Sequence, residues 1–352
     1  MRVRYYKNME RTLIKDSINK VGKEVLLKGW VNTRRDHGKI VFIDLRDRTG
    51  IVQVVAGPDL VEGLHSEDVI YVTGLVKARP EKLVNPKLST GTVEVEAKKV
   101  DLVSKAAELP FDMGQETLQL ELPTLLDNRA LTFRHPKVRA IFKVQEVIID
   151  AFRRALIAKD FMEFQSPSII PSIPEGGAEV FEVKYFEHTA FLAQSPQLYK
   201  SLLVSAFERV FSVNQVFRAE PSVTTSHIAE FTSLDAEMGF IDSWEEVRDM
   251  AEYTIKYIFD EIQKKCSQEL ALFGAVIPEV SQKIPHLKLR EAQQIIFERT
   301  KRDCRQEKDL APEDEREICK WATEKHQSEL VFISHYPTKY RPFYTYPDDE
   351  DP

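Results

Sequence analysis

Apolar and polar residues alternate in five short runs within the first third of the chain. The runs cover residues 25–32, 40–46, 51–56, 69–77 and 92–102, and turns that contain glycine separate them. A period of two is typical of strands that bury one face, and short strands at even spacing are typical of small barrels. The pattern therefore predicts a closed five-stranded barrel, preceded by one or two helical turns around residues 10–20.

The second run fixes the direction of one aromatic ring. Val41 and Ile43 share a face, so Phe42 points the other way. An outward aromatic ring can stack on an unpaired base, while Arg34 holds a phosphate and the amide of Gln53 reads a base edge. The alternative is that Phe42 is itself the core residue. Two further arginines lie on the same strands, Arg35 and Arg46. We interpret residues 1–103 as an oligonucleotide-binding (OB-type) barrel.

The pattern changes twice after the barrel. Residues 104–135 are polar and interrupted by prolines, which predicts a hinge. From Pro136 to Leu156, apolar residues recur at three- and four-residue spacing, which predicts a long helix. Helix, strand and hairpin then follow without alternating β-α-β units. Residues 136–352 are therefore expected to form an α+β domain, with an antiparallel sheet flanked by helices.

One predicted hairpin concentrates the candidate chemistry. Residues 217–240 read FRAEPSVTTSHIAEFTSLDAEMGF, two runs of charged and apolar residues joined by a polar loop. Arg218 and Glu220 lie on the first run, His227 in the loop, and Phe231 and Asp235 on the second. An arginine and carboxylates on rigid strands suit a site for a polyphosphate, its metal ions and a charged ligand. A solvated hairpin with cross-strand ion pairs is the plainer alternative.

Two further segments carry polar candidates. A glycine turn in EGGAEVFEV contains Glu175. The segment QSPQLYK begins a helix, with Ser195 near its cap and Pro196 in its first turn. Gln197 and Lys200 are three residues apart, so their side chains share one face of that helix.

Charge and cysteine content narrow the class of protein. The first 110 residues carry 20 Lys and Arg against 15 Asp and Glu, whereas the remaining residues carry 29 against 41. A basic front domain fits a polyanionic partner, although a solvated lysine-rich surface gives the same excess. The three cysteines lack metal-ligand or redox spacing, and neither a secretory leader nor a long apolar run is present. These features predict a cytoplasmic protein without a membrane segment. The patterns GxxxxGK[ST], GxGxxG and HExxH are also absent.

Taken together, the motifs resemble those of aspartyl-tRNA synthetases, which are class II aminoacyl-tRNA synthetases. The barrel run is followed by FMEFQSPSIIP (motif 1), EGGAEVF, QSPQLYK, FRAE with HIAEFTSLDAEM (motif 2), LAPEDER and RPFYTY. These segments occur in family order over nearly the whole chain, which makes the resemblance specific. It implies ATP-dependent activation of L-aspartate to aspartyl-adenylate and transfer of the aspartyl group to tRNA(Asp). Whether tRNA(Asn) is a second acceptor stays open.

The resemblance also implies roles for individual residues. Arg218 would contact the α-phosphate of ATP and the substrate carboxylate, and Phe231 would stack under adenine. Glu220 would accept from the adenine amino group or contact the tRNA end, and His227 would reach the γ-phosphate. Arg218, Glu220 and His227 would thus be catalytic. The aspartate pocket would be lined by Glu175, Ser195, Gln197, Lys200, Arg218 and Asp235. Lys200 would pair with the side-chain carboxylate, which a cation complements.

Partners follow from the same resemblance. Arg34, Phe42 and Gln53 would contact the tRNA anticodon. Pro167 of motif 1 would lie at the interface of a homodimer. ATP and Mg²⁺ would be required, and the metal-binding glutamate is expected beyond Pro352.

Two features depart from the family pattern. Ser226 stands where many relatives place an arginine, which puts one contact to phosphate or acceptor stem in doubt. The chain also stops at Pro352, where the family sheet continues with a metal-binding glutamate, a second carboxylate-binding arginine and motif 3. We therefore expect a C-terminally truncated chain with little or no adenylation activity, whose barrel still binds tRNA. Aspartate-dependent pyrophosphate exchange clearly above background would contradict this expectation.

Two other functions compete with aspartate–tRNA ligation. The first is an asparaginyl-tRNA synthetase, which shares the barrel and motif 2. Lys200 favours aspartate over asparagine because a neutral amide needs no cation, and a cationic pocket would repel lysine. The second is a non-catalytic, tRNA-binding fragment of a synthetase.

Overall fold

The computed structural model describes residues 9–115, 117–173, 179–219, 228–280, 283–341 and 344–348. The chain divides into two compact units, and the boundary between them falls between His135 and Pro136.

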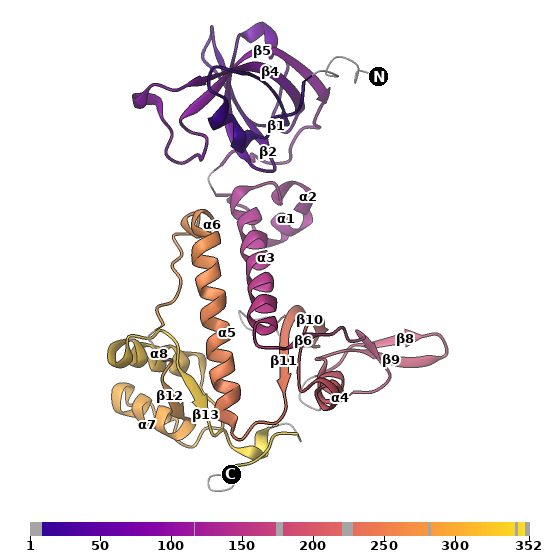
Figure 1. The fold of residues 1–352 in the computed structure, drawn as a ribbon, viewed down its shortest axis with the longest axis vertical. Coiled ribbons are helices and arrows are strands. Elements are labelled where there is room, and N and C mark those ends of the chain that lie inside the picture. Colours follow the sequence, from indigo (N-terminus) through magenta and orange to yellow (C-terminus); the bar gives the residue numbers. More distant parts are fainter. Residues whose placement is uncertain are drawn as a thin grey trace. The chain divides into compact units, whose positions relative to one another are not determined.

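The first unit contains a closed barrel (Figure 1). Its strands are β1 (Glu24–Asp36), β2 (Val41–Asp47), β3 (Gly50–Ala56), β4 (Val69–Ala78) and β5 (Val93–Ser104). The closed order is β1-β2-β3-β5-β4, with β3 and β5 parallel and the other pairs antiparallel. Val41 and Ile43 are fully buried in the barrel core, whereas Phe42 is only half-buried. The predicted barrel and the outward direction of Phe42 are both confirmed.

Short helices accompany the barrel strands. The helical turns expected around residues 10–20 form a 3₁₀ helix, η2 (Ile14–Lys20). Two shorter 3₁₀ helices, η3 (Pro58–Leu60) and η4 (Glu81–Leu83), lie in connections. The segment interpreted as a hinge contains α1 (Leu122–Asp127) and α2 (Arg129–Thr132). Proline is tolerated at the first position of a helix, so a proline-rich segment can still form short helices.

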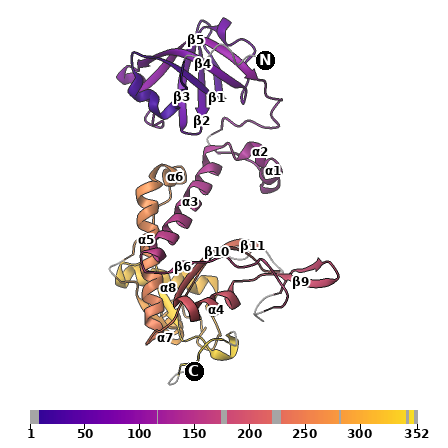
Figure 2. The same cartoon turned by 45° about the vertical axis from the view of Figure 1, so that its right-hand side comes forward.

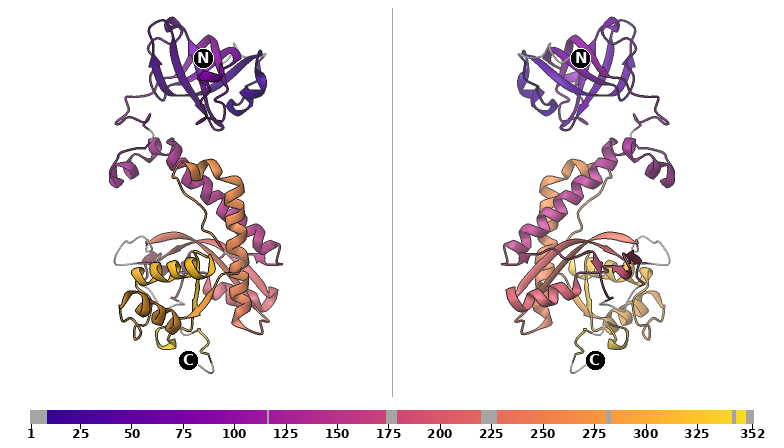
Figure 3. Two further views of the ribbon diagram at one scale, coloured as in Figure 1. Left: turned by 90° about the vertical axis from the view of Figure 1, so that its left-hand side faces the viewer. Right: turned by 90° about the vertical axis from the view of Figure 1, so that its right-hand side faces the viewer.

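Two long helices cover one face of the main sheet in the second unit (Figures 2 and 3). The sheet has the order β11-β10-β6, with β6 (Met162–Glu163), β10 (Arg209–Phe217) and β11 (Glu230–Met238). The helices are α3 (Pro136–Ile157) and α5 (Trp244–Lys265). Phe152 and Leu156 of α3 pack against Phe211 of β10, and Met250 and Ile258 of α5 join them. The long helix predicted from Pro136 is confirmed.

A second sheet and a short helix lie between β6 and β10 in the sequence. The sheet is antiparallel, with the order β7 (Ile169–Ile170), β9 (His188–Leu192) and β8 (Glu182–Tyr185). It leads into α4 (Gln197–Phe207). This long connection lets β6 pair with β10 in parallel, where we expected an antiparallel sheet throughout.

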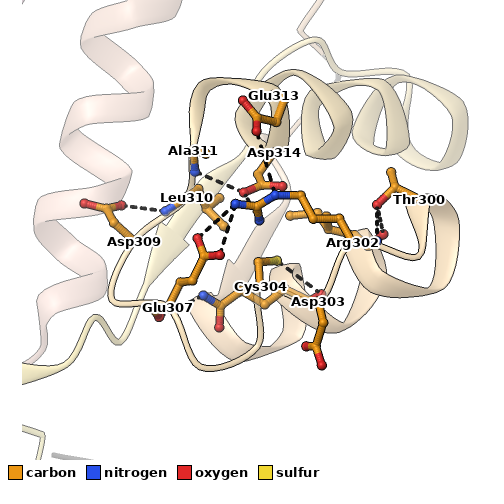
Figure 4. Close-up of polar contacts among 12 residues, drawn as sticks. Thr300, Arg302, Asp303, Cys304, Glu307, Asp309, Leu310, Ala311, Glu313 and Asp314 are labelled. Atoms are coloured by element: carbon orange, nitrogen blue, oxygen red, sulfur yellow. Dashed lines mark hydrogen bonds and ion pairs between the residues drawn. The ribbon is translucent and has the colours of Figure 1, made fainter.

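A small subdomain follows α5 and the short helix α6 (Ser267–Ala271). It consists of β12 (His286–Lys288), α7 (Leu289–Thr300), α8 (Pro312–His326) and β13 (Phe332–Ser334), with β12 and β13 parallel; the 3₁₀ helix η5 (Thr338–Tyr340) comes after it. Ala292, Ile296 and Ile318 form its core. Between α7 and α8, Arg302 donates to Asp314 at 2.8 Å and to Glu307 at 3.0 Å (Figure 4).

Phe211 offers a test of the main packing. Its ring is fully buried and meets Phe152 edge to face, with centroids 5.7 Å apart. Replacing a buried phenylalanine by alanine removes apolar contacts and leaves a cavity, at a cost of about 3–5 kcal/mol. We expect Phe211→Ala to lower the free energy of unfolding of the second unit by this amount in a urea titration followed by Trp fluorescence. Phe240→Ala is the matched control because Phe240 is 91% exposed; an equal effect in both variants would contradict the packing.

Candidate active site and nucleic-acid interface

The β10–β11 hairpin has one packed face and one polar face. Phe211 of β10 belongs to the core formed with α3 and α5, and Leu234 of β11 packs against that core. The register pairs Ser212 with Asp235, and paired residues of antiparallel strands point to the same side of a sheet. Since side chains alternate, Phe231 lies on the side of Asp235, away from Leu234. The polar face therefore includes an aromatic ring.

Hydrogen bonds fix the side chains of this polar face. Asn214 donates to Ser212 at 2.9 Å and to Ser166 at 3.1 Å. Ser233 donates to a carboxylate oxygen of Asp235. The carboxylate of Asp235 is consequently held in one orientation before any ligand binds, which reduces the ordering cost of binding.

Lys200 reaches the same carboxylate from α4, which lies across this face of the hairpin (Figure 2). Its Nζ donates to Asp235 Oδ1 at 3.1 Å and lies 3.8 Å from Glu237 Oε2. The side chain of Lys200 is 13% exposed and that of Asp235 is 14% exposed. An ammonium carries three N–H donors, and the hydrogen bond to Asp235 uses one of them. The lysine is thus a largely buried cation whose position is set by two carboxylates.

Ser195 and Gln197 lie at the start of α4. Ser195 Oγ accepts a hydrogen bond from the backbone N–H of Gln197 at 3.1 Å. The side-chain amide of Gln197 donates to Ser201 at 3.2 Å. Gln197 is the first helical residue, with Pro196 before it at the cap position, so the predicted helix start is confirmed to within one residue.

Arg218 directly follows β10. Its backbone N–H donates to the carbonyl of Ala229, which continues the hairpin past the last paired strand residues. The guanidinium carbon of Arg218 lies 5.4 Å from the centroid of the Phe231 ring, a cation–π contact. The arginine and the aromatic ring therefore lie next to each other, on adjacent strands of the hairpin.

On the barrel, β2 and β3 carry the candidate base-binding residues. Phe42 meets the ring of His37 edge to face at 5.4 Å. Gln53 pairs with Asp44 in the β2–β3 register and donates to Glu94 at 3.0 Å. Phe42, Asp44 and Gln53 thus share the outer surface of the barrel.

Two arginines of β1 and β2, Arg34 and Arg46, differ in how exposed their side chains are. Arg34 pairs with Asp36 at 3.2 Å and keeps its side chain 29% exposed. Arg46 is only 5% exposed. Its guanidinium donates twice to the buried carboxylate of Glu67, each time at 2.9 Å. The guanidinium of Arg46 is therefore buried and paired with a carboxylate.

Comparison with known proteins identifies the family. A family model described as class II tRNA synthetases (D, K and N) matches residues 121–352, and one described as an OB-fold nucleic acid binding domain matches residues 25–103. The chain belongs to the class II tRNA synthetases of the D, K and N group.

Individual relatives agree with this family. The chain is 40% identical to the aspartate–tRNA(Asp/Asn) ligase of Thermus thermophilus over 97% of its own length and 78% of the relative. It is 38% identical to the aspartate–tRNA(Asp) ligase of Pyrococcus abyssi over 94% of this chain and 76% of the relative.

Solved synthetase structures share the fold. An aspartyl-tRNA synthetase from Entamoeba histolytica superposes with a TM-score of 0.84 at 26% identity, covering 99% of this chain and 75% of that one. An asparaginyl-tRNA synthetase from Pyrococcus horikoshii, complexed with asparaginyl-adenylate, superposes with a TM-score of 0.83 at 28% identity, covering 97% and 78%. The predicted combination of an OB-type barrel with an α+β class II synthetase domain is confirmed.

The structure describes only some of the residues of the predicted site. Lys200 and Asp235 are in contact, and Arg218 and Phe231 are in contact. Glu175, Glu220 and His227 lie outside the described residues. Pro167 is exposed in the connection between β6 and β7.

Two residues of the candidate site were given no role from the sequence. Glu237 approaches Lys200, and Ser233 orients Asp235. Both could have been found by alternation, because Ser233, Asp235 and Glu237 are successive residues on one side of a strand.

Metal ligands and membrane segments were also sought. Within the described ranges, no three His, Cys, Asp or Glu side chains are grouped as a metal site would require. Among the same residues, no helix combines the length and the apolar character needed to cross a bilayer.

Proposed function

We propose that this synthetase chain is an aspartate–tRNA ligase, which activates L-aspartate with ATP and transfers it to tRNA(Asp). The observation that carries the proposal is the largely buried Lys200 ammonium, held 3.1 Å from Asp235 on the polar face of the motif 2 hairpin. A cation fixed at this place complements an acidic side chain. The names of the relatives from Thermus thermophilus and Pyrococcus abyssi support the same choice.

The charges around Lys200 match the charges of free aspartate. The amino acid carries one ammonium and two carboxylates. We assign its side-chain carboxylate to Lys200 and its ammonium to Asp235, with Glu175 as a second partner that the family pattern implies. Ser195 and Gln197 would complete the pocket at the start of α4. Glu237, 3.8 Å from Lys200, would help to hold the lysine side chain in place beside the ligand.

ATP would bind along the hairpin. Adenine would stack on Phe231, and Arg218 would hold the α-phosphate while the aspartate carboxylate attacks the α-phosphorus and pyrophosphate leaves. A guanidinium suits this role because its planar donors contact two oxygens at once and its charge offsets the charge that grows on the phosphoryl oxygens. Glu220 would accept from the adenine amino group and His227 would reach the γ-phosphate. A hydroxyl of the 3′-terminal ribose of the tRNA then attacks the acyl carbon of the adenylate, takes the aspartyl group and releases AMP.

Magnesium has no ligand set among the described residues. No step of the proposed chemistry is therefore assigned to a metal ion, and the need for Mg²⁺ stays a prediction.

The barrel would hold the anticodon. We propose that Phe42 stacks on one anticodon base, that Gln53 reads its edge and that Arg34 contacts the backbone. Base–aromatic stacking contributes about 1–3 kcal/mol per base. Phe42→Ala is therefore expected to weaken tRNA(Asp) binding by roughly 10- to 100-fold in a filter-binding titration. Phe186→Ala, which removes a 77% exposed ring from the β8–β9 turn, is the matched control and should leave the affinity unchanged.

A binding panel tests the amino acid specificity. Non-hydrolysable adenylate analogues of aspartate, asparagine and lysine are titrated into the chain by calorimetry. We expect the aspartyl analogue to bind at least about 100-fold more tightly than the other two, because only it brings an anionic side chain to Lys200. Tighter binding of the asparaginyl analogue would favour an asparaginyl-tRNA synthetase, a function also carried by a structural neighbour. If the chain binds tRNA(Asp) but binds none of the three analogues, the result would favour a non-catalytic tRNA-binding protein.

Two further properties are proposed on the family pattern. A homodimer would place Pro167 and the exposed Ile141 and Phe142 of α3 at its interface. Use of tRNA(Asn) as a second acceptor stays open, because the named relatives include ligases for tRNA(Asp) and for both tRNAs.

A further inference from the structure

The small subdomain touches the start of α5 through side chains that the proposed ligase chemistry does not use. Trp244 is the first residue of α5, and its ring lies 5.1 Å from the ring of His286 and 6.0 Å from that of His335. His286 begins β12, and His335 directly follows β13. The indole therefore contacts the ends of both strands of the subdomain.

Ser334 joins the two imidazoles. Its Oγ lies 2.6 Å from His286 Nε2 and 2.6 Å from His335 Nδ1. On the other side of the second ring, His335 Nε2 lies 3.6 Å from Asp348 Oδ2. His335 adopts a φ of 53°, a left-handed conformation that is uncommon outside glycine. We call Trp244, His286, Ser334 and His335 the histidine clasp.

The number of hydrogens available for hydrogen bonds among Ser334, His286 and His335 depends on pH. A serine hydroxyl has one hydrogen to donate, and a neutral imidazole has one donor and one acceptor nitrogen. With both rings neutral, one nitrogen accepts the Ser334 hydrogen and the other ring donates to Oγ. Once both rings are protonated, neither nitrogen can accept, and two cations face a single oxygen. Protonation of one ring keeps both hydrogen bonds, whereas protonation of both rings leaves the Ser334 hydrogen without an acceptor nitrogen in the clasp.

Some of the charged groups around the clasp raise the pKa of His286 and others lower it. Arg248 of α5 stacks on Trp244 with its guanidinium carbon 5.4 Å from the ring centroid. Together with His335 it disfavours a charged His286, whereas Glu245 of α5 and Glu291 of α7 favour one. Burial is the largest cause and, with Arg248 and His335, lowers the pKa of His286 below its ordinary value. Asp348 is the charged group next to the other ring, with its Oδ2 3.6 Å from His335 Nε2.

We propose that the histidine clasp is a proton-sensitive fastening, which holds the small subdomain to the start of α5 while both imidazoles are neutral and releases it when they are protonated. A histidine whose pKa is lowered by folding stabilises the folded state most above the unfolded-state pKa, near 6.5, and the stabilisation is lost as the pH falls through the folded-state pKa. The loosening is therefore expected below the ordinary pKa of histidine. The proposal is independent of which amino acid the chain activates.

Hydrogen exchange on the full chain tests the proposal. Exchange is followed by mass spectrometry from about pH 7.5 to about pH 5.5, a range in which histidine titrates, and is corrected for the intrinsic effect of pH. We expect corrected rates in residues 286–334 to rise severalfold on acidification, while those of the barrel strands do not. His286→Gln keeps a hydrogen-bonding amide that cannot be protonated, and it should abolish the rise.

A second histidine provides the control. His326 lies 5.0 Å from the ring of Trp321 on α8, a similar ring contact outside the clasp. His326→Gln should retain the wild-type pH response. A flat corrected rate in the wild type, or an unchanged response in His286→Gln, would overturn the proposal. If His286→Gln does not fold, the imidazole signals of the wild-type chain decide by NMR: titration of His286 at or above 6.5 would also overturn it.

Discussion

Lys200→Met is expected to lower the affinity for an aspartyl-adenylate analogue by about 3–5 kcal/mol, or roughly two to four powers of ten. The change removes the cation proposed to pair with the substrate side chain, and it leaves Asp235 and Glu237 without their common counter-ion. The two remaining carboxylates would then repel the ligand. Calorimetry with the purified variant measures the loss directly.

The matched control for this variant is Lys184→Met. Lys184 lies on β8, is exposed, and takes no part in the hairpin site. The Lys184→Met variant should bind the aspartyl-adenylate analogue as the wild type does. Lys200→Met should also keep wild-type affinity for tRNA(Asp) through the barrel, and a wild-type urea unfolding transition of the second unit would show that the variant is folded. Wild-type affinity of Lys200→Met for the aspartyl-adenylate analogue would refute the assignment of the pocket.

Arg218→Ala is expected to weaken ATP binding by roughly 100-fold or more, since each charge-assisted hydrogen bond to phosphate contributes about 1.5–3 kcal/mol. The variant also removes the cation–π contact with Phe231, so the adenine-stacking ring loses one neighbour. Arg218→Lys should recover only part of the affinity, because an ammonium keeps the charge and lacks the planar fork of donors. Equilibrium titration with ATP compares the three proteins.

Arg209→Ala serves as the control for charge removal on the same strand. Arg209 begins β10, and its guanidinium donates to the carbonyl of Lys159 at 3.1 Å, away from Phe231 and Arg218. We expect unchanged ATP affinity. Equal losses in Arg209→Ala and Arg218→Ala would mean that net charge, and not the geometry of Arg218, accounts for ATP binding.

Much of the fold could be predicted because its signals are local. Alternation at Val41, Phe42 and Ile43 placed the core side of β2, and apolar spacing from Pro136 to Leu156 placed α3. Such periods report directly which side of an element is buried. The contact between Lys200 and Asp235 was expected from the family resemblance, and their separation of 35 residues carries no local signal.

What could not be predicted depends on tertiary contacts. The strands β6 and β7 are two residues long, too short for a period to appear. Arg46 reads as a surface cation, and only the closed barrel brings Glu67 to it. The small subdomain likewise depends on a parallel pair, β12 and β13, whose strands are separated by two helices.

The central claim is that the Lys200 ammonium recognises the carboxylate of the amino acid side chain. A cycle of four titrations tests it most directly: wild type and Lys200→Met, each with the aspartyl and the asparaginyl adenylate analogue. We predict that the wild type prefers the aspartyl analogue and that Lys200→Met loses most of this preference, with a coupling free energy of about 2 kcal/mol or more. An equal preference in both proteins would contradict the account, because the lysine would then not sense the charge of the ligand.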